Sequence, residues 1–221
     1  MKRERQTPLT KEIQNYIYEN FNAEDELLSE ISNQCWAEAT IPQINITGYQ
    51  ANFLQFLIKA IDAKNILEIG TLAGYSAIVM ARASSAEAKI LTIEKEKKHA
   101  DYAMKKISEA GFSNKIKVQV EDARQFVKHF TPQTKLDFIF LDANKSSYSQ
   151  YFDELAPHLR QGGMIVADNA FAFGFLLDSA PERNPKEVRS MLSFHKYLLE
   201  RDDFFTTIVP IGDGMLISLK K

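Results

Sequence analysis

The stretch from Asn65 to Ser76, NILEIGTLAGYS, holds the residues best suited to binding a small molecule. An apolar run typical of a strand contains Glu68 and ends at a glycine, Gly70, and a second glycine, Gly74, opens a segment with helical character. A glycine directly after a strand lets the backbone turn tightly and approach a ligand, because no Cβ stands in the way. Open α/β sheets bind their ligands at such carboxyl ends of strands.

The carboxylate of Glu68 indicates which kind of ligand suits this loop. It would repel a pyrophosphate and attract an ammonium group. The spacings G-x-G-x-x-G and G-x-x-x-x-G-K-[ST], which dinucleotides and phosphates require, do not occur here. The loop therefore favours a cofactor with a cationic amino-acid end, S-adenosylmethionine rather than NAD or ATP. A glycine turn that only links a strand to a helix is the alternative, and the later motifs count against it.

Acidic residues also follow the next two apolar runs. Glu94 ends the second run, where a carboxylate can accept both hydroxyls of a ribose. Asp122 and Ala123 follow the third run, at the level expected for an adenine ring. The alternatives are a solvated charge for Glu94 and a helix N-cap for Asp122, and the cap is compatible with cofactor binding.

Oxygen ligands follow the fourth and fifth runs. Asp142 ends one, and Asp168 with Asn169 ends the other. If these strands are neighbours, two carboxylates and one amide meet beside the cofactor, and such a set suits Mg²⁺, Mn²⁺ or Ca²⁺. The four histidines are scattered and form no i, i+4 pair. Asp142 alone would more often be a helix cap, but the matched positions favour a metal site.

Lys145, three residues after Asp142, is a candidate general base. A divalent cation and a sulfonium nearby would disfavour its ammonium form and lower its pKa. The alternative is an ordinary solvated lysine.

These residues need a sheet to bring them together, and the chain from Asn65 onward predicts one. Apolar runs alternate with amphipathic segments, which indicates parallel strands with helices on both faces of the sheet. The expected strands are Ile66–Ile69, Ile90–Ile93, Ile116–Val120, Phe138–Leu141, Met164–Ala167, Phe205–Val209 and Met215–Leu219. The expected helices between the first five are Tyr75–Ala83, His99–Ala110, Ala123–His129 and Tyr148–Leu159.

Asp213 and Gly214 lie between the last two runs and predict a hairpin, so the last strand should be antiparallel. The turn also explains Asp213 without a functional role. Residues 1–62 are predicted to form a helical cover, with helices starting after Thr10, after Asp25 and around Gly48, and residues 63–221 to form the α/β core of a single domain.

Composition and charge restrict the classes of function and the cellular location that we expect. The chain has 221 residues, 27 Lys and Arg against 29 Asp and Glu, and one cysteine, Cys35. The charge balance disfavours nucleic-acid binding, and one cysteine cannot form an intrachain disulfide. The charged start Met1–Gln6 precedes no long apolar run, so we expect no signal peptide, no membrane span and a cytoplasmic location.

Taken together, four motifs resemble the class I, cation-dependent O-methyltransferases. This family includes caffeoyl-CoA and catechol O-methyltransferases and many small bacterial relatives. The resemblance extends from about Pro42 to the end of the chain. Its motifs are Leu67–Ser76 (LEIGTLAGYS), Phe140–Lys145 (FLDANK), Gly162–Asn169 (GGMIVADN) and Pro210–Gly214 (PIGDG).

The resemblance implies a role for each motif position, and a homodimer. Glu68, Gly70 and Ser76 would line the methionine part of S-adenosylmethionine, Glu94 would hold the ribose, and Asp122 and Ala123 would lie near the adenine. Asp142, next to the cofactor, Asp168 and Asn169 would bind the cation, and Lys145 would help deprotonate the acceptor hydroxyl. The family usually has Asp at position 144 and often Trp at position 172, where this chain has Asn144 and Ala172.

The sequence thus predicts a cation-dependent O-methyltransferase that acts on a small aromatic vicinal diol. The apolar segment Ala170–Leu177 would form part of the acceptor wall or a lid, so the acceptor need be neither a coenzyme A ester nor a simple catechol. Two alternatives stay open at this point: a methyltransferase acting on RNA or protein, and a non-catalytic S-adenosylmethionine-binding protein. The missing basic stripe disfavours the first, and the metal triad with Lys145 disfavours the second.

Overall fold

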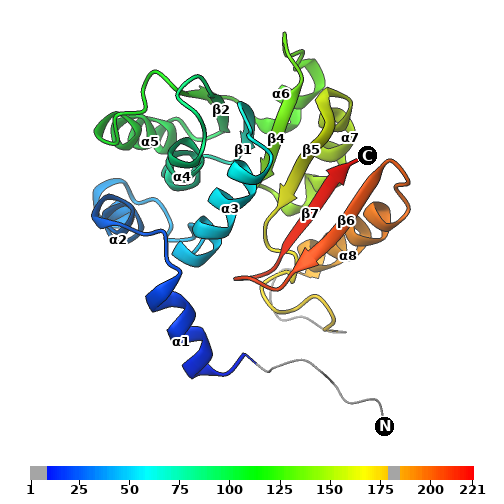
Figure 1. The fold of residues 1–221 in the computed structure, drawn as a ribbon, viewed down its shortest axis with the longest axis horizontal. Coiled ribbons are helices and arrows are strands. Elements are labelled where there is room, and N and C mark those ends of the chain that lie inside the picture. Colours follow the sequence, from blue (N-terminus) through cyan, green and yellow to red (C-terminus); the bar gives the residue numbers. More distant parts are fainter. Residues whose placement is uncertain (1–8, 179–184) are drawn as a thin grey trace.

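Seven segments, most of them rich in apolar residues, form the strands of one sheet in the computed structural model, which describes residues 9–178 and 185–221 (Figure 1). The charged start Met1–Gln6 lies outside the described residues. The strands are β1 (Asn65–Ile69), β2 (Lys89–Glu94), β3 (Ile116–Val120), β4 (Leu136–Leu141), β5 (Leu159–Ala167), β6 (Phe204–Val209) and β7 (Met215–Lys220).

The strand order is β3-β2-β1-β4-β5-β7-β6. Strands β1 to β5 pair in parallel, whereas β7 lies between β5 and β6 and is antiparallel to both. The predicted sheet, mostly parallel with an antiparallel last strand, is therefore confirmed, as is the hairpin from β6 to β7.

The register of the central strands brings three predicted site residues to one edge. Ile69 pairs with Leu141, and Leu141 pairs with Ala167. The next residue of each strand is then Gly70, Asp142 or Asp168. The ladder continues through two of these positions, since Asp142 N donates to Ile69 O (2.9 Å) and Asp168 N donates to Leu141 O (3.0 Å).

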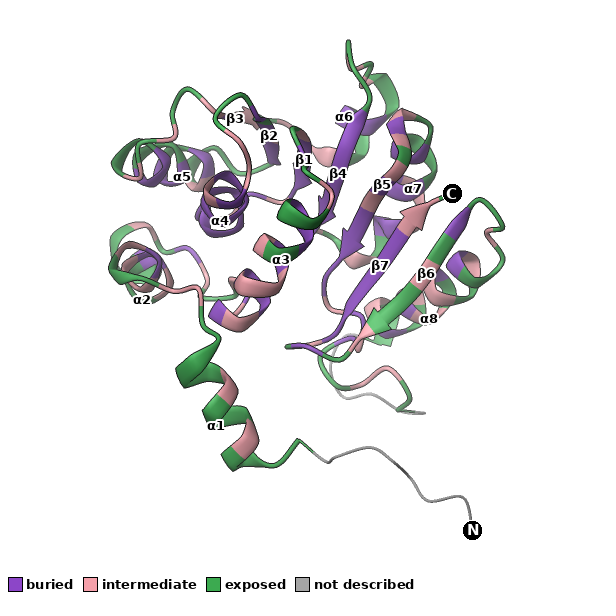
Figure 2. Cartoon of the chain, in the orientation of Figure 1, coloured by how far each residue is buried: buried purple, intermediate pink, exposed green. Residues whose placement is uncertain are grey.

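Helices cover both faces of this sheet, as predicted, because the central strands are apolar on both sides. Phe138 and Phe140 of β4 belong to the hydrophobic cluster on one face, and Ile139 and Leu141 belong to the cluster on the other. Figure 2 shows β4 buried along its length. The first cluster includes residues of α2 (Glu26–Ala39), α3 (Gly48–Ala60), α4 (Tyr75–Ala83) and α5 (Lys97–Glu109). The second includes residues of α6 (Ala123–His129), α7 (Tyr148–Leu155) and α8 (Pro185–Leu199).

Two element predictions were wrong. The helix expected over Tyr148–Leu159 stops at Leu155, a 3₁₀ turn covers Ala156–His158, and β5 begins at Leu159, five residues before the expected start. Pro157 accounts for this, because it has no N–H to continue the helix. Helix α8 was not predicted at all.

The helices before β1 begin where the sequence places their caps. Thr10 accepts from Ile13 N at the start of α1 (Lys11–Asn20), and Asp25 accepts from Leu28 N at the start of α2. Helix α1 contains no buried residue and extends away from the rest of the molecule (Figures 1 and 2). Nowhere in the described part of the chain is a helix both long and apolar enough to cross a membrane.

Candidate active site

A cavity of about 430 Å³ opens where the central parallel strands end. It brings together residues that are far apart in the sequence. Seven of the predicted site residues line it: Gly70, Glu94, Asp122, Ala123, Asp142, Lys145 and Asn169. The other three, Glu68, Ser76 and Asp168, are buried and do not line it.

Gly70 must be glycine at the entrance of the loop after β1. Its φ is +104°, a conformation that L side chains rarely adopt, and a Cβ would lie 2.1 Å from the carbonyl oxygen of Asp142. The loop can therefore lie directly against the end of β4 only without a side chain. This close approach brings Gly70 and Asp142 into the same cavity wall.

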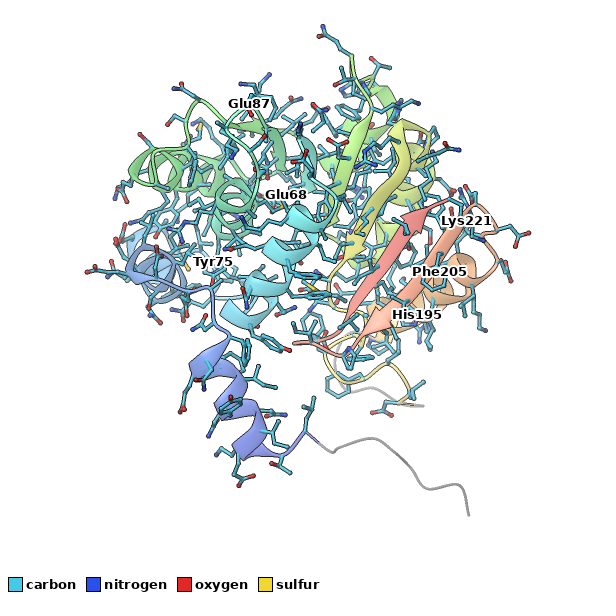
Figure 3. All side chains as sticks on the ribbon, viewed as in Figure 1. Glu68, Tyr75, Glu87, His195, Phe205 and Lys221 are labelled. Carbon is cyan, nitrogen blue, oxygen red and sulfur yellow. The ribbon has the colours of Figure 1, made fainter. Side chains whose placement is uncertain are left out.

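Glu68 is fully buried near the centre of the molecule (Figure 3) and joins the start of α4 to β2. Its two oxygens accept from Ser76 Oγ and Thr92 Oγ1, each at 2.5 Å. Burial is the largest influence on this carboxyl group, and together with the charges of Asp142 and Glu94 it raises the pKa to about 8 despite the two hydroxyl donors.

Glu94, at the end of β2, faces the cavity and orders its rim. Oε2 accepts from Leu72 N (2.8 Å) and Oε1 accepts from Glu96 N (2.9 Å). Both neighbours belong to loops that line the cavity. A carboxylate here can fix the two loops and still use its remaining lone pairs for a ligand hydroxyl.

Asp122 combines the two roles considered for it, since it caps α6 and lines the cavity. Its carboxylate accepts from Arg124 N (2.9 Å) and from Arg124 Nη2 (2.7 Å). The side-chain hydrogen bond from Arg124, together with the backbone one and the charge of Arg124, outweighs burial and lowers the pKa of Asp122 to about 2. Ala123, the first residue of α6, lines the cavity beside it.

Lys145 and Asp142 form an ion pair in the cavity wall, with Nζ 2.8 Å from Oδ1. Lys145 also lies over the ring of Tyr148, 5.7 Å from its centroid. Burial is the largest influence and alone would lower the pKa of Lys145, but the charge and hydrogen bond of Asp142, together with Tyr148 and Asp168, outweigh it and raise the pKa above its ordinary value. The sequence argument expected a lowered pKa for Lys145 because a bound cation and a sulfonium would lie nearby. In the protein alone, the negative charge of Asp142 acts in the opposite direction.

Asp168 is only 5% exposed, and its Oδ1 accepts from Gln50 Nε2 at 2.7 Å. Burial and the charge of Asp142 raise the pKa of Asp168. Asn169 has a left-handed φ of +57°, and its Nδ2 donates to Asp213 Oδ2 at 3.1 Å. The amide nitrogen is thus turned toward Asp213.

Two residues of this network were not recognised as part of the site. Gln50 could have been found only as a capping partner, because Thr47 and Gln50 match the S/T-x-x-E/Q pattern. Asp213 was assigned to a turn, and the turn exists, with Gly214 N donating to Ile211 O at 2.9 Å. The side chain of Asp213 does more, because it also accepts from Phe173 N at 2.7 Å.

The two departures from the family pattern have local explanations. Asn144 Oδ1 accepts from Ser146 N (3.1 Å) and Ser146 Oγ (2.8 Å), so it caps the short helix η1 (Lys145–Ser147), a role that Asp would also fill. Ala172 is buried with φ +50°, and the next side chain, Phe173, lines the cavity instead.

In the described ranges, no group of three or more His, Cys, Asp or Glu side chains is placed to hold a metal ion. The predicted set has two carboxylates, Asp142 and Asp168, and its third member is the amide of Asn169. The set therefore has fewer than three side chains of these four types, and its third oxygen donor is an amide.

An α/β sheet of this order, with acidic strand ends around a cavity, is typical of proteins that bind a small molecule at the carboxyl ends of parallel strands. Comparisons with known proteins specify the class. The model of the O-methyltransferase family matches residues 18–221. The chain belongs to this family and is an S-adenosylmethionine-dependent O-methyltransferase.

Individual relatives agree with this assignment. The chain is 38% identical to a catechol O-methyltransferase of Niastella koreensis over 168 residues, which is 75% of this chain and 76% of that one. It is 26% identical to a caffeoyl-CoA O-methyltransferase of Populus kitakamiensis over 215 residues, 93% and 92% of the two chains. Its fold matches an O-methyltransferase of Bacillus cereus solved with SAH, with a TM-score of 0.85, 29% identity, and 95% and 97% coverage.

Proposed function

We propose that this enzyme transfers the methyl group of S-adenosylmethionine to one hydroxyl of a small aromatic vicinal diol, with the help of a divalent cation. The observation that carries the proposal is the single cavity that brings Glu94, Asp142, Lys145 and Asn169 together. The names of the relatives, catechol and caffeoyl-CoA O-methyltransferases, support an acceptor of this kind.

The residues present fit a cation. Asp142 and Asp168 end neighbouring strands, and the charge of Asp142 raises the pKa of Asp168. Two carboxylates held close together in a buried place are costly, and a divalent ion offsets that cost. Because the Nδ2 atom of Asn169 is bound to Asp213, its Oδ1 is the atom left for a ligand role. Hard oxygen donors of this kind suit Mg²⁺, Mn²⁺ or Ca²⁺.

Each proposed site residue then has a defined role. Glu94 binds the ribose hydroxyls, Ala123 and Asp122 border the adenine, and Gly70 lets the backbone approach the methionine end. Glu68 and Ser76 support this loop from behind. Asp142, Asp168 and Asn169 would hold the cation, which when bound would supply the positive charge that lowers the pKa of an acceptor hydroxyl.

Lys145 Nζ would take the proton of that hydroxyl, directly or through water, as the neutral amine, a form that a cation and a sulfonium bound beside it would favour by repelling the ammonium charge. The acceptor oxygen attacks the methyl carbon as the bond from that carbon to sulfur breaks, and the products are a methyl ether and S-adenosylhomocysteine. Much of the rate gain comes from holding the two reactants in line. Ile44 and Phe173, both in the cavity lining, provide apolar contacts for an aromatic ring.

A methyl-transfer assay on a panel of vicinal diphenols, with and without chelator, tests this function. We expect turnover of at least one diphenol, loss of turnover in chelator, and recovery when Mg²⁺ or Mn²⁺ is restored. Turnover of RNA or a protein but of no diphenol would favour the alternative acceptor class. Full turnover in excess chelator would overturn the cation dependence and leave the methyl transfer intact.

We also propose that the enzyme is a homodimer, in keeping with its family. Helix α1 supports this, because it buries none of its residues within the chain. Tyr16 is 59% exposed and Phe21, directly after the helix, is 50% exposed. A second copy of the chain would cover this apolar surface.

A further inference from the structure

Gln50 is a buried polar residue at the start of α3, and every part of its amide has a partner. It is 3% exposed. Its Oε1 atom accepts from Thr47 N at 3.0 Å and lies 3.1 Å from Thr47 Oγ1. Its Nε2 atom donates to Asp168 Oδ1 at 2.7 Å, across 118 positions of sequence. The residue therefore joins the cap of a helix to a carboxylate of the proposed cation site.

The direction of this amide is fixed by chemistry. Thr47 N–H can only donate, so the atom of Gln50 that faces it must be the carbonyl oxygen. The NH₂ group then necessarily faces Asp168, and the carboxylate oxygen receives a donor. A flipped amide would place a donor against the Thr47 N–H and an acceptor against the Asp168 carboxylate, and both contacts would be unfavourable.

A third segment holds Gln50 from the opposite side. A Cβ on Gly212 would lie 2.3 Å from Cδ and 2.4 Å from Oε1 of Gln50, so the loop between β6 and β7 lies directly on the amide. Gly212 has a φ of +57°, which suits glycine. Gln50 is thus enclosed by the α3 cap, the end of β5 and the loop 210–214.

We propose that Gln50 is a positioning residue for Asp168. It holds Oδ1 of that carboxylate in one place and leaves the second oxygen for the divalent cation. This inference rests on the proposed cation dependence. It makes the segment before β1 part of the active site, although Gln50 does not itself line the cavity. Residues that hydrogen-bond a metal ligand in this way commonly change metal affinity 10- to 100-fold when they are replaced.

The test compares Gln50→Met with Thr47→Ala in the full chain. Gln50→Met keeps the volume against Gly212 and removes the donor to Asp168. Thr47→Ala removes the other half of the same capping box and leaves the Thr47 N–H, which still orients Gln50. Both variants lose part of the α3 cap, so a purely structural effect should be similar in the two. Mn²⁺ alone is titrated and followed by electron paramagnetic resonance, and SAH binding and thermal unfolding are measured in parallel.

We expect Gln50→Met to weaken Mn²⁺ binding by roughly 10- to 100-fold, with SAH affinity within about twofold of wild type, and Thr47→Ala to bind Mn²⁺ as wild type does. Wild-type Mn²⁺ affinity in Gln50→Met would overturn the positioning role and leave the cation proposal intact. Equal weakening in both variants would assign the effect to the helix cap and also overturn it. If wild type itself bound no Mn²⁺, the cation proposal would fail first and the role of Gln50 with it.

Discussion

Lys145 Nζ and Asp142 Oδ1 lie 2.8 Å apart, so the proposed base and one proposed cation ligand form a single ion pair. The pair is largely buried, with side-chain exposures of 12% and 20%. Removing either partner therefore leaves a charge in a place with little water, and the two residues cannot be treated as independent.

Lys145→Met should reduce kcat by roughly 10²- to 10⁴-fold, the usual contribution of a general base. The methionine retains the apolar stem over Tyr148 but cannot accept a proton. SAH affinity should change little, because the proposed ribose and adenine contacts lie at β2 and α6. Steady-state kinetics with a diphenol and calorimetry with SAH check both parts. Lys97→Met, at a lysine that is 76% exposed, is the control, and a similar loss of kcat there would contradict the assignment.

Glu94→Ala should weaken SAH binding by about 1–3 kcal/mol, the usual value of hydrogen bonds to a charged group. The variant loses the proposed ribose contact and also releases Leu72 N and Glu96 N, which Glu94 holds at 2.8 and 2.9 Å. Isothermal calorimetry measures the change. Glu87, an exposed glutamate before β2, provides the control Glu87→Ala, which should bind SAH normally. Unchanged affinity in Glu94→Ala would remove Glu94 from the cofactor site.

Asp137 in β4 should make stability depend on pH in the acidic range. Its Oδ2 accepts from Lys64 N (2.8 Å) and Asn65 N (2.7 Å), and its Oδ1 accepts from Arg160 Nε at 2.6 Å. Burial raises the pKa of Asp137, but these hydrogen bonds and the charge of Arg160 outweigh it and lower the pKa below the ordinary value. Because the folded pKa is below the unfolded one, the stabilisation is present above the unfolded pKa and is lost as pH falls through the folded pKa.

Asp137→Asn should therefore lower the free energy of unfolding by about 1–3 kcal/mol at pH 7. The difference from wild type should shrink below pH ~3.9, the ordinary pKa of Asp, as the wild-type carboxyl group becomes protonated. Urea unfolding at several pH values measures this. Asp62→Asn, at a side chain that is 74% exposed, is the control. A difference that stayed constant down to pH 2 would show that the charge of Asp137 is not what stabilises the strand.

The sequence predicted those parts of the fold that depend on local pattern. Parallel strands with apolar residues on both faces give long apolar runs, so β1, β2 and β4 were located to within two residues. Strand β3 was located equally well from apolar residues at alternate positions. Helix α8 was not predicted, although its buried apolar residues Val188, Met191, Phe194 and Leu198 follow helical spacing. The end of α7 was predicted four residues too late, although Pro157 marks it in the sequence.

The site was predictable where each residue ends a strand, since the register of a parallel sheet places such residues at one edge. Glu94, Asp142 and Asn169 are of this kind. Gln50 and Asp213 are different, because their contacts join segments that only tertiary packing brings together. The raised pKa of Glu68 could not be predicted either, because the burial that causes it exists only in the folded protein.

Helix α1 should take part in self-association. Ile13 and Ile17 lie one turn apart on this helix, which has no buried residue in the chain described. Ile13→Asp with Ile17→Asp should shift a dimer toward monomer and leave SAH binding unchanged, because both residues are remote from the cavity. Sedimentation velocity at micromolar concentration measures the effect. A wild-type chain that is monomeric at every concentration would refute the proposed dimer, and a dimer that is unaffected by the double variant would place the interface elsewhere.

Asp213 should act on turnover through the two groups that it holds. Its Oδ2 atom accepts from Asn169 Nδ2 (3.1 Å) and from Phe173 N (2.7 Å), and so ties the loop between β6 and β7 to a proposed cation ligand and to the apolar cavity wall. Asp213→Ala removes both bonds and frees the Asn169 amide to rotate. Because Asn169 and Phe173 both have left-handed backbone conformations, with φ of +57° and +61°, the loop that follows β5 depends on such bonds to keep its shape.

We expect Asp213→Ala to lower kcat/KM for a diphenol by roughly 10- to 100-fold, the scale set by residues that orient a metal ligand. SAH affinity should stay within about twofold of wild type, since the proposed cofactor contacts at the ends of β1 to β3 do not involve this loop. Asp213→Asn separates the charge from the geometry: its remaining carbonyl oxygen can still accept from Phe173 N, so a partial recovery of kcat/KM is expected. Wild-type kinetics in Asp213→Ala would show that the hairpin turn alone explains this residue, as its sequence context first indicated.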